Sequence, residues 1–269
     1  MKTNRIFVTL LVAVLFLITS CEFFTHSLGE GFARDQAKLL AKSSASSILT
    51  ASGSMSEKAI LEALGTKSKE ELKGLSKSDK ETVLNITFDG SLNTSQIAPL
   101  ADEFLNNQSG TSPEQGMQNL ANQLVDLITP VNTSAAQELL NDQQTLETVA
   151  GNQLANAAFA LLAQSAKELN NSSPPIDIMG NMGNQEPPLN LQTSTTQDIV
   201  DAMLDNPTSA NENASDQLVT AINTLKVLSG APIDLDGNGT TEVVPRPENE
   251  DITLFGALPL TDLLSQIGL

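Results

Sequence analysis

Residues 154–169 read LANAAFALLAQSAKEL, and this stretch decides the fold class. Its apolar side chains recur at the spacing of an α-helix, which places them along one side of that helix. They are Leu154, Ala158, Leu161, Leu162 and Leu169. The same helical pattern extends over about 133–169, with a predicted break near Asp142. The centre of the chain is therefore predicted to be helical.

Helix start and stop signals extend this prediction towards the amino end. Small and apolar residues follow a helical stripe, and three Ser-x-x-Glu capping boxes come after it. The stripe consists of Ala33, Ala37, Leu40, Ala41, Ser44 and Ile48, and the boxes pair Ser54 with Glu57, Ser68 with Glu71, and Ser78 with Glu81. Gly65 is expected to end the helix that starts at the first box.

Further helices are predicted on both sides of the central stretch. Ser112, Pro113 and Pro130 bound one of them, and Gly230 with Pro232 stops another. Their predicted ranges are 113–129, 196–205, 214–229 and 260–268, and a small β excursion is expected near residue 88 or 242. The sequence therefore predicts an all-α protein, an irregular helical bundle with long polar loops.

The chain divides into five predicted parts. Residues 171–194 begin with Asn-Asn-Ser-Ser-Pro-Pro and contain further Gly and Pro residues, which is typical of a loop or linker. The predicted parts are a signal peptide (1–20), a tether (21–30), a helical domain (31–170), this linker (171–194) and a smaller helical region (195–269).

Charge is distributed unevenly along the chain. Residues 21–80 carry nine Lys/Arg and eight Asp/Glu, whereas residues 81–269 carry three Lys/Arg and twenty-four Asp/Glu. Such an acidic surface repels phosphate backbones, so nucleic acid is excluded as a partner. Tryptophan and tyrosine are absent, which argues against a sugar-binding cleft built on aromatic rings.

The amino end has the features of a bacterial export signal. Lys2 and Arg5 precede thirteen residues, 6–18, of which Thr9 is the only polar one. That run fits the apolar part of a signal peptide and falls short of the ~20 residues that span a bilayer. The small residues Thr19 and Ser20 then lead to Cys21, the only cysteine.

Ile18-Thr19-Ser20-Cys21 resembles the bacterial lipobox. The resemblance implies that the Cys21 thiol receives a diacylglyceryl group, that the chain is cut before it, and that the new amino end is acylated. Two or more acyl chains hold a protein stably on a membrane. Because Glu22 rather than Asp follows the cysteine, the resemblance also implies the outer membrane of a diderm bacterium.

A second short resemblance lies at 234–242, which reads DLDGNGTTE. It resembles the Asp-x-Asp-x-Asn-Gly calcium loops of EF-hand-like proteins, with Gly239 at the turn. The resemblance implies calcium as a cofactor, with ligands from Asp234, Asp236, Asn238, Thr240 and Glu242. The closing glutamate of that pattern is replaced by Pro245, so weak, about millimolar affinity is expected. Asp-Gly and Asn-Gly also form turns without metal, and this alternative stays open.

Other chemistry finds little support in the residues. His26, the only histidine, lies in the tether, and Met179 with Met182 lacks a neighbouring Cys or His for copper. The leading hypothesis is a non-enzymatic envelope lipoprotein, bound to the membrane through its lipid, with a structural or partner-binding role and an unknown protein partner. The alternatives are a carrier whose helix at 154–169 lines an apolar cavity and, third, a hydrolase that uses acidic residues.

Overall fold

Helices make up most of the regular structure in the part of the chain that the computed structural model describes. That part comprises residues 37–38, 40–51, 55–92, 127–172, 176, 189–204, 212–235, 237–247, 250–254 and 258–261. Its helices are α2 (Ala45–Thr50), α3 (Glu57–Leu64), α4 (Lys69–Lys73), α5 (Lys77–Ser91), α8 (Ser134–Leu140), α9 (Gln143–Thr148), α10 (Gly151–Asn170), α12 (Thr196–Leu204) and α13 (Glu212–Leu228). The two strands, β1 (Thr253–Leu254) and β2 (Leu258–Pro259), form one antiparallel pair. The prediction of an all-α protein is confirmed.

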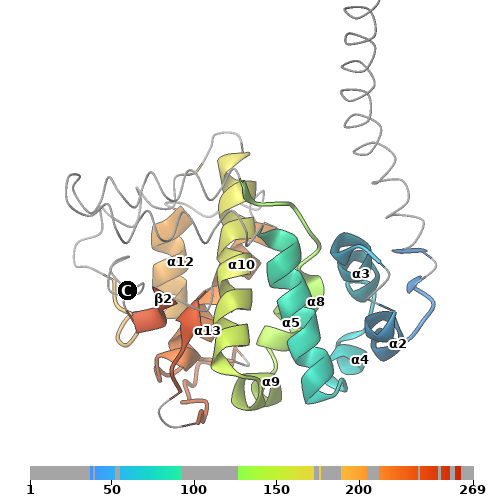
Figure 1. Cartoon of the computed structure of the whole chain (residues 1–269). Coiled ribbons are helices and arrows are strands. Elements are labelled where there is room, and N and C mark those ends of the chain that lie inside the picture. Colours follow the sequence, from blue (N-terminus) through green and yellow to red (C-terminus); the bar gives the residue numbers. More distant parts are fainter. Residues whose placement is uncertain are drawn as a thin grey trace, which may run out of the picture.

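Helix α10 lies at the centre of the bundle. It packs against α13 on one side and α5 on the other, while α12 covers α13 (Figure 1). Leu154, Ala158 and Leu161, which the sequence places on its apolar side, are fully buried in a core shared with α13. That core runs from Leu40 to Leu260, so the predicted domain 31–170 and the predicted region 195–269 both contribute to it.

At the predicted capping box of α4, only the serine forms the expected hydrogen bond. The Ser68 side chain accepts a hydrogen bond from the Glu71 amide at 3.2 Å, as predicted, and caps α4. The Glu71 carboxylate does not return to its own helix start. It accepts a hydrogen bond from the Ala45 amide instead, at 2.6 Å, and so links α4 to the start of α2.

The other two predicted boxes are wrong by two residues. Helix α3 is capped by Ser56, not by Ser54, which lies outside the described residues. Helix α5 is capped by Ser76, and Ser78 lies inside it. The capping serine accepts a hydrogen bond from the backbone N–H of the third helical residue, and this bond forms whether or not that residue is an acid. Because each predicted serine has a second serine two positions away, the Glu signal selected the wrong one of each pair.

The predicted stripe over 33–48 does not form one helix. A turn at 41–43 interrupts it, and the Ser44 side chain caps α2 by accepting from the Ser47 amide at 3.3 Å. The Lys67 ammonium donates to the carbonyls of Ala41 and Ser43 and thereby stabilises the turn. Gly65 follows α3 as its C-cap, as predicted.

The break predicted near Asp142 is confirmed. Asp142 caps α9 by accepting from the Thr145 amide at 3.1 Å and from the Thr145 hydroxyl at 2.7 Å. It also binds Lys80, whose side chain is only 3% exposed, at 3.2 Å. Burial would raise the pKa of Asp142, but the hydrogen bonds from Thr145 and Lys80 and the charge of Lys80 together hold that pKa below its ordinary value.

A second break, between α9 and α10, was not predicted. Arg246 donates to the carbonyls of Leu146 and Val149 at the end of α9, and it pairs with Glu250. The Glu250 carboxylate accepts from the Gly151 amide at the start of α10. The cation thus lies at a helix carboxyl end and the anion at a helix amino end, as the helix dipoles favour. A Cβ at Gly151 would lie 2.8 Å from the Glu250 carboxyl group.

Of the remaining predicted elements, some are confirmed and others are not. Helices α12 and α13 confirm the ranges predicted near 196–205 and 214–229, and Gly230 ends α13 with a left-handed φ of 73°. Phe88 itself is buried within α5, but the predicted β excursion near it has a counterpart in Leu92, which directly follows α5 and forms an isolated bridge with Ile128. Residue 242 does form an isolated bridge with Ile233. Residues 113–126 and 262–268 of the other two predicted helices lie outside the described residues.

The described part holds no helix that is both long and apolar enough to cross a bilayer.

Candidate binding sites

The loop predicted to bind calcium is closed by the bridge between Ile233 and Glu242. The two residues exchange backbone hydrogen bonds of 2.9 and 2.8 Å. Within the loop, the Asp234 carboxylate accepts from the amides of Asn238 at 3.1 Å and Gly239 at 2.8 Å. The Asn238 side chain in turn accepts from the Thr240 amide at 2.7 Å. These side chains therefore stabilise a tight turn.

Two glycines in this loop have backbone angles that other residues rarely adopt. Gly237 and Gly239 have φ values of 72° and 84°, in the left-handed region that glycine reaches without strain. The chain therefore reverses sharply at the point where the calcium pattern requires a turn.

The Asp234 carboxylate already accepts two amide hydrogen bonds within the loop. Each oxygen of the Asp234 carboxylate keeps a further lone pair after accepting its amide hydrogen bond. The second predicted carboxylate, Asp236, lies outside the described residues. Among the residues that are described, no group of three or more His, Cys, Asp or Glu side chains is close enough to hold a metal. Calcium binding stays a prediction for this loop.

A pocket of about 800 Å³ lies between the first described residues, α3, the segment before α8 and the start of α13. This volume falls within the range of roughly 300–1,000 Å³ that is typical of ligand sites. The lining residues come from segments far apart in the chain: Ala37, Lys38, Ala41, Lys58, Glu62, Thr66, Pro130, Val131, Asn132, Thr133, Ser134, Asn213 and Gln217. The lining is therefore mixed in polarity and includes charged side chains of both signs.

A buried polar chain supports one wall of this pocket. Gln217 and Thr133 are each only 4% exposed, and the Gln217 amide nitrogen donates to the Thr133 hydroxyl at 2.9 Å. The Gln217 amide oxygen accepts from the hydroxyl of Ser165, on α10, at 3.0 Å. Because each of these buried groups has a partner, this series of hydrogen bonds fixes the wall of the pocket to α10 and α13. Gln217 and Thr133 are therefore held in fixed positions in the lining.

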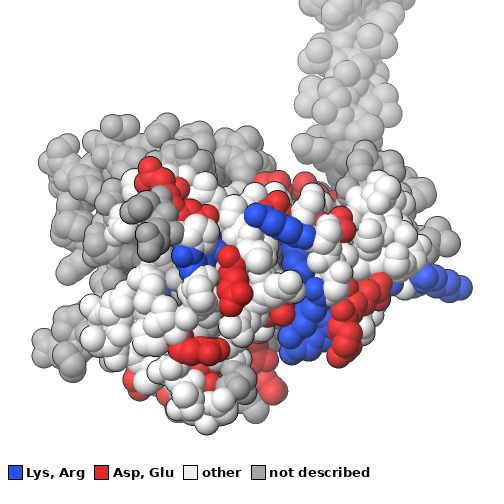
Figure 2. All heavy atoms as spheres, turned by 90° about the horizontal axis from the view of Figure 1, so that it is seen from below, with Lys and Arg blue, Asp and Glu red and all other residues white. Residues whose placement is uncertain are grey.

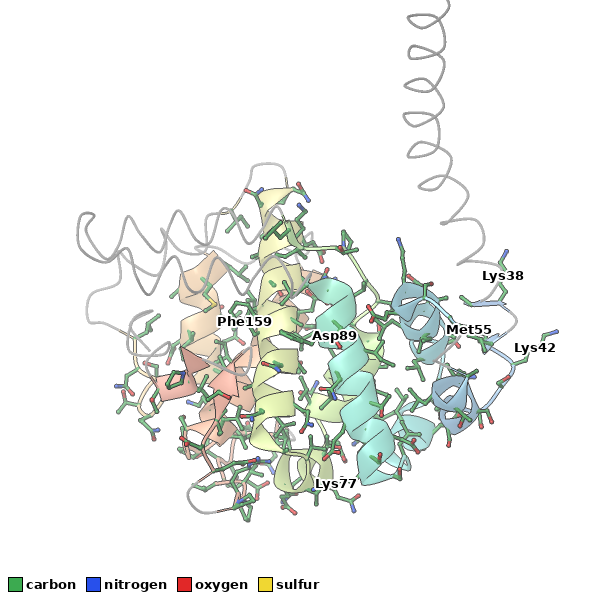
Figure 3. All side chains as sticks on the ribbon, in the orientation of Figure 1. Lys38, Lys42, Met55, Lys77, Asp89 and Phe159 are labelled. Atoms are coloured by element: carbon green, nitrogen blue, oxygen red, sulfur yellow. The ribbon has the colours of Figure 1, made fainter. Side chains whose placement is uncertain are left out.

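Glu57 and Asp89 form a pair of carboxylates with raised pKa values. Burial and then the charge of Asp89 raise the pKa of Glu57, and burial raises the pKa of Asp89. Both residues remain exposed, and neither belongs to the pocket lining. Figure 3 labels Asp89 on α5. An acid-dependent hydrolase needs such a pair, but the structure does not bring this one to the pocket.

The structure describes only some of the site residues that the sequence predicts. Cys21, His26, Met179 and Met182 lie outside the described residues, as does Asp236. Sequence reasoning missed the pocket, because its lining comes from four distant segments. The one local signal was Gln217, a polar residue beside the apolar face of α13, and a surface position explains such a residue equally well.

No family model matches this chain, and no curated protein or solved structure matches it either.

Proposed function

We propose that the chain is an exported lipoprotein of the bacterial outer membrane whose helical body has a non-enzymatic, partner-binding role. The observation that carries this proposal is the order of elements at the amino end. Two cations precede an apolar run, two small residues follow it, and Cys21 comes next as the only thiol in the chain. A triacylated Cys21 would hold the body stably on the membrane.

The pocket supports a binding role for the body. Ala37, Lys38 and Ala41 belong to its lining and are among the first described residues after Cys21. The buried Gln217 side chain donates to Thr133 and accepts from Ser165, so these bonds hold a preformed surface in place. The partner we propose is a protein of the envelope that inserts a segment into this pocket.

Metabolic labelling with palmitate tests the lipid anchor. Wild-type protein should take up label, whereas Cys21→Ser should take up none, because its only acceptor thiol is gone. Cys21→Ser combined with Ser27→Cys is the matched control, since it restores a thiol six residues away from the cleavage site. Label on this double variant would show that any thiol suffices, and equal label on wild type and Cys21→Ser would overturn the anchor.

A pull-down from detergent-solubilised envelopes tests the pocket. Thr66 lines the pocket and is exposed, so Thr66→Trp should fill space and reduce the yield of whatever partner wild-type protein captures. Thr50→Trp adds the same ring at an exposed position outside the lining and should leave the yield unchanged. Equal capture by both variants would remove the pocket from the proposal.

A further inference from the structure

We propose that the face formed by residues 37–38 and 40–51 lies against the anionic phospholipid headgroups of the membrane. This inference rests on the proposed lipid anchor and adds an orientation to it. The face, here called the lysine face, exposes Lys38 and Lys42 together with hydroxyl side chains. The exposed hydroxyl residues are Ser44, Ser46, Ser47 and Thr50.

The local charge favours this contact. Residues 36–56 contain Lys38 and Lys42 but no Asp or Glu, although the whole chain has a net charge of −18. The elements packed against this face bring one acid for each base, since Lys67 and Glu71 both bind its backbone and Lys58 and Glu62 share the pocket with Lys38. Lys38 and Lys42 therefore remain as excess positive charge. Anionic lipids attract such lysines and repel the acid-rich remainder of the chain. Ammonium groups donate hydrogen bonds to phosphate oxygens. The Thr50 hydroxyl already donates to the Ser46 carbonyl, and the hydroxyls of Ser44 and Ser47 bond one another, so the two lysines carry this contact.

Most neighbouring lysines are engaged with other groups of the protein. Lys69 pairs with Glu138, Lys73 and Lys80 both pair with Asp142, and Lys77 pairs with Glu81. Figure 2, which views the molecule from below, shows blue and red side chains next to one another on that face. For Lys38 and Lys42, by contrast, no ion pair is found among the described residues, and Figure 3 shows both side chains pointing outward from the body.

The lysine face is firmly attached to the rest of the body. Lys67 binds the carbonyl of Ala41 at 2.7 Å and also that of Ser43, and Glu71 accepts from the Ala45 amide at 2.6 Å. These bonds join the turn and the start of α2 to the segment around α4. A membrane contact made by Lys38 and Lys42 would therefore orient the whole helical body. Because Lys38 also lines the pocket, this contact would place the pocket beside the headgroups, and a protein partner would enter it along the membrane surface.

The described part of the body begins at residue 37, on the lysine face, sixteen residues after Cys21. Fully extended, this stretch spans at most roughly 55 Å, which is enough for the lysine face to reach the bilayer. In Figure 1, α2 and α3 lie on one side of the α5–α10 pair, and α12 and α13 lie on the other. Contact through the lysine face would thus turn α12 and α13 away from the membrane. Each lysine should favour this orientation about fivefold.

Distance-dependent quenching on vesicles tests this orientation with the full mature lipoprotein. Its only cysteine carries the lipid, so an engineered cysteine is the only free thiol. Ser46→Cys places a fluorophore on the lysine face, and Thr241→Cys places one on the 233–242 loop; both positions are exposed. The vesicles contain phosphatidylcholine with or without phosphatidylglycerol, and a nitroxide on the headgroups acts as the quencher.

Phosphatidylglycerol should increase quenching of the label at residue 46 and leave that at residue 241 low. Lys38→Glu with Lys42→Glu should abolish the increase, as should high salt. The matched control, Lys69→Glu with Lys77→Glu, reverses the same charge at exposed lysines elsewhere and should preserve it. Circular dichroism checks that each variant is folded.

Two results would overturn the proposal. One is equal quenching at residue 46 with and without phosphatidylglycerol. The other is that the Lys69→Glu, Lys77→Glu control loses as much of the quenching increase as the Lys38→Glu, Lys42→Glu variant. Failure of the anchor looks different, because the protein would then leave even pure phosphatidylcholine vesicles. A protein that stays bound without a preferred orientation would contradict only the present inference.

Discussion

Replacing Asp142 should destabilise the fold more than any change to an exposed ion pair. Its carboxylate accepts from the Lys80 ammonium at 3.2 Å, lies 3.7 Å from the Lys73 ammonium and caps α9 through Thr145. The Lys80 side chain is 3% exposed and that of Asp142 is 14% exposed. Removing the acid therefore leaves a cation almost wholly buried without its partner.

The size of the effect follows from two separable contributions. Asp142→Asn keeps a side chain that caps well and removes only the charge. Breaking a fully buried pair costs about 3–5 kcal/mol, and partial access of water to Asp142 reduces this to about 2–3 kcal/mol. Asp142→Ala also removes the cap, which costs about 1 kcal/mol more. Lys77→Met breaks an exposed pair and should cost under about 1 kcal/mol.

Urea unfolding followed by circular dichroism measures these differences, since the chain has no Trp or Tyr for fluorescence. Asp142 has a lowered pKa, so its contribution is complete above the unfolded value of about 3.9. The difference between wild type and Asp142→Asn should therefore shrink as the pH falls below about 4. Adding Lys80→Met to Asp142→Asn should recover part of the loss. A cost for Asp142→Asn no larger than that of Lys77→Met would refute the reasoning.

Three further predictions follow from the described geometry. Gly151→Ala should lower the free energy of unfolding by about 1–3 kcal/mol in a thermal melt, because the added Cβ would overlap its neighbours. Gly90→Ala, where the nearest atoms are 3.4 Å away, should be neutral or stabilising. Calorimetry should detect calcium binding at about millimolar concentration, and Asp234→Ala with Asp236→Ala should remove it; no heat from wild type would leave the loop a simple turn. Glu57→Gln should stabilise the fold slightly at neutral pH, because the raised pKa of Glu57 marks an unfavourable charge. That gain should vanish as the pH falls and Glu57 itself becomes protonated, and a gain that persisted at low pH would contradict this origin.

The sequence predicts the helices well where local chemistry decides them. Asp142 marks a helix boundary because its side chain caps the next turn, three residues away. Ser68 does the same for α4. The sequence did not distinguish Ser54 from Ser56 as the cap of α3, because several serines satisfy the same local rule. Local patterns therefore identify an element more reliably than they identify its first residue.

Contacts between distant residues account for what the sequence did not predict. The break between α9 and α10 is held by Arg246 and Glu250, about a hundred residues downstream. The turn that divides the 33–48 stripe is held by Lys67. The pocket likewise exists only after folding brings its segments together. No pattern within one helix reports such contacts.

Mass spectrometry of the protein purified from membranes tests the central claim most directly. The mature lipoprotein should begin at Cys21, lack residues 1–20 and carry a diacylglyceryl group on the thiol and an acyl group on the amino end. Mild alkaline hydrolysis cleaves only the two ester bonds, so it should then leave residues 21–269 with a glyceryl group on the Cys21 sulfur and one amide-linked acyl chain. A chain that still begins at Met1, or one that begins at Cys21 with no added mass, would contradict the account.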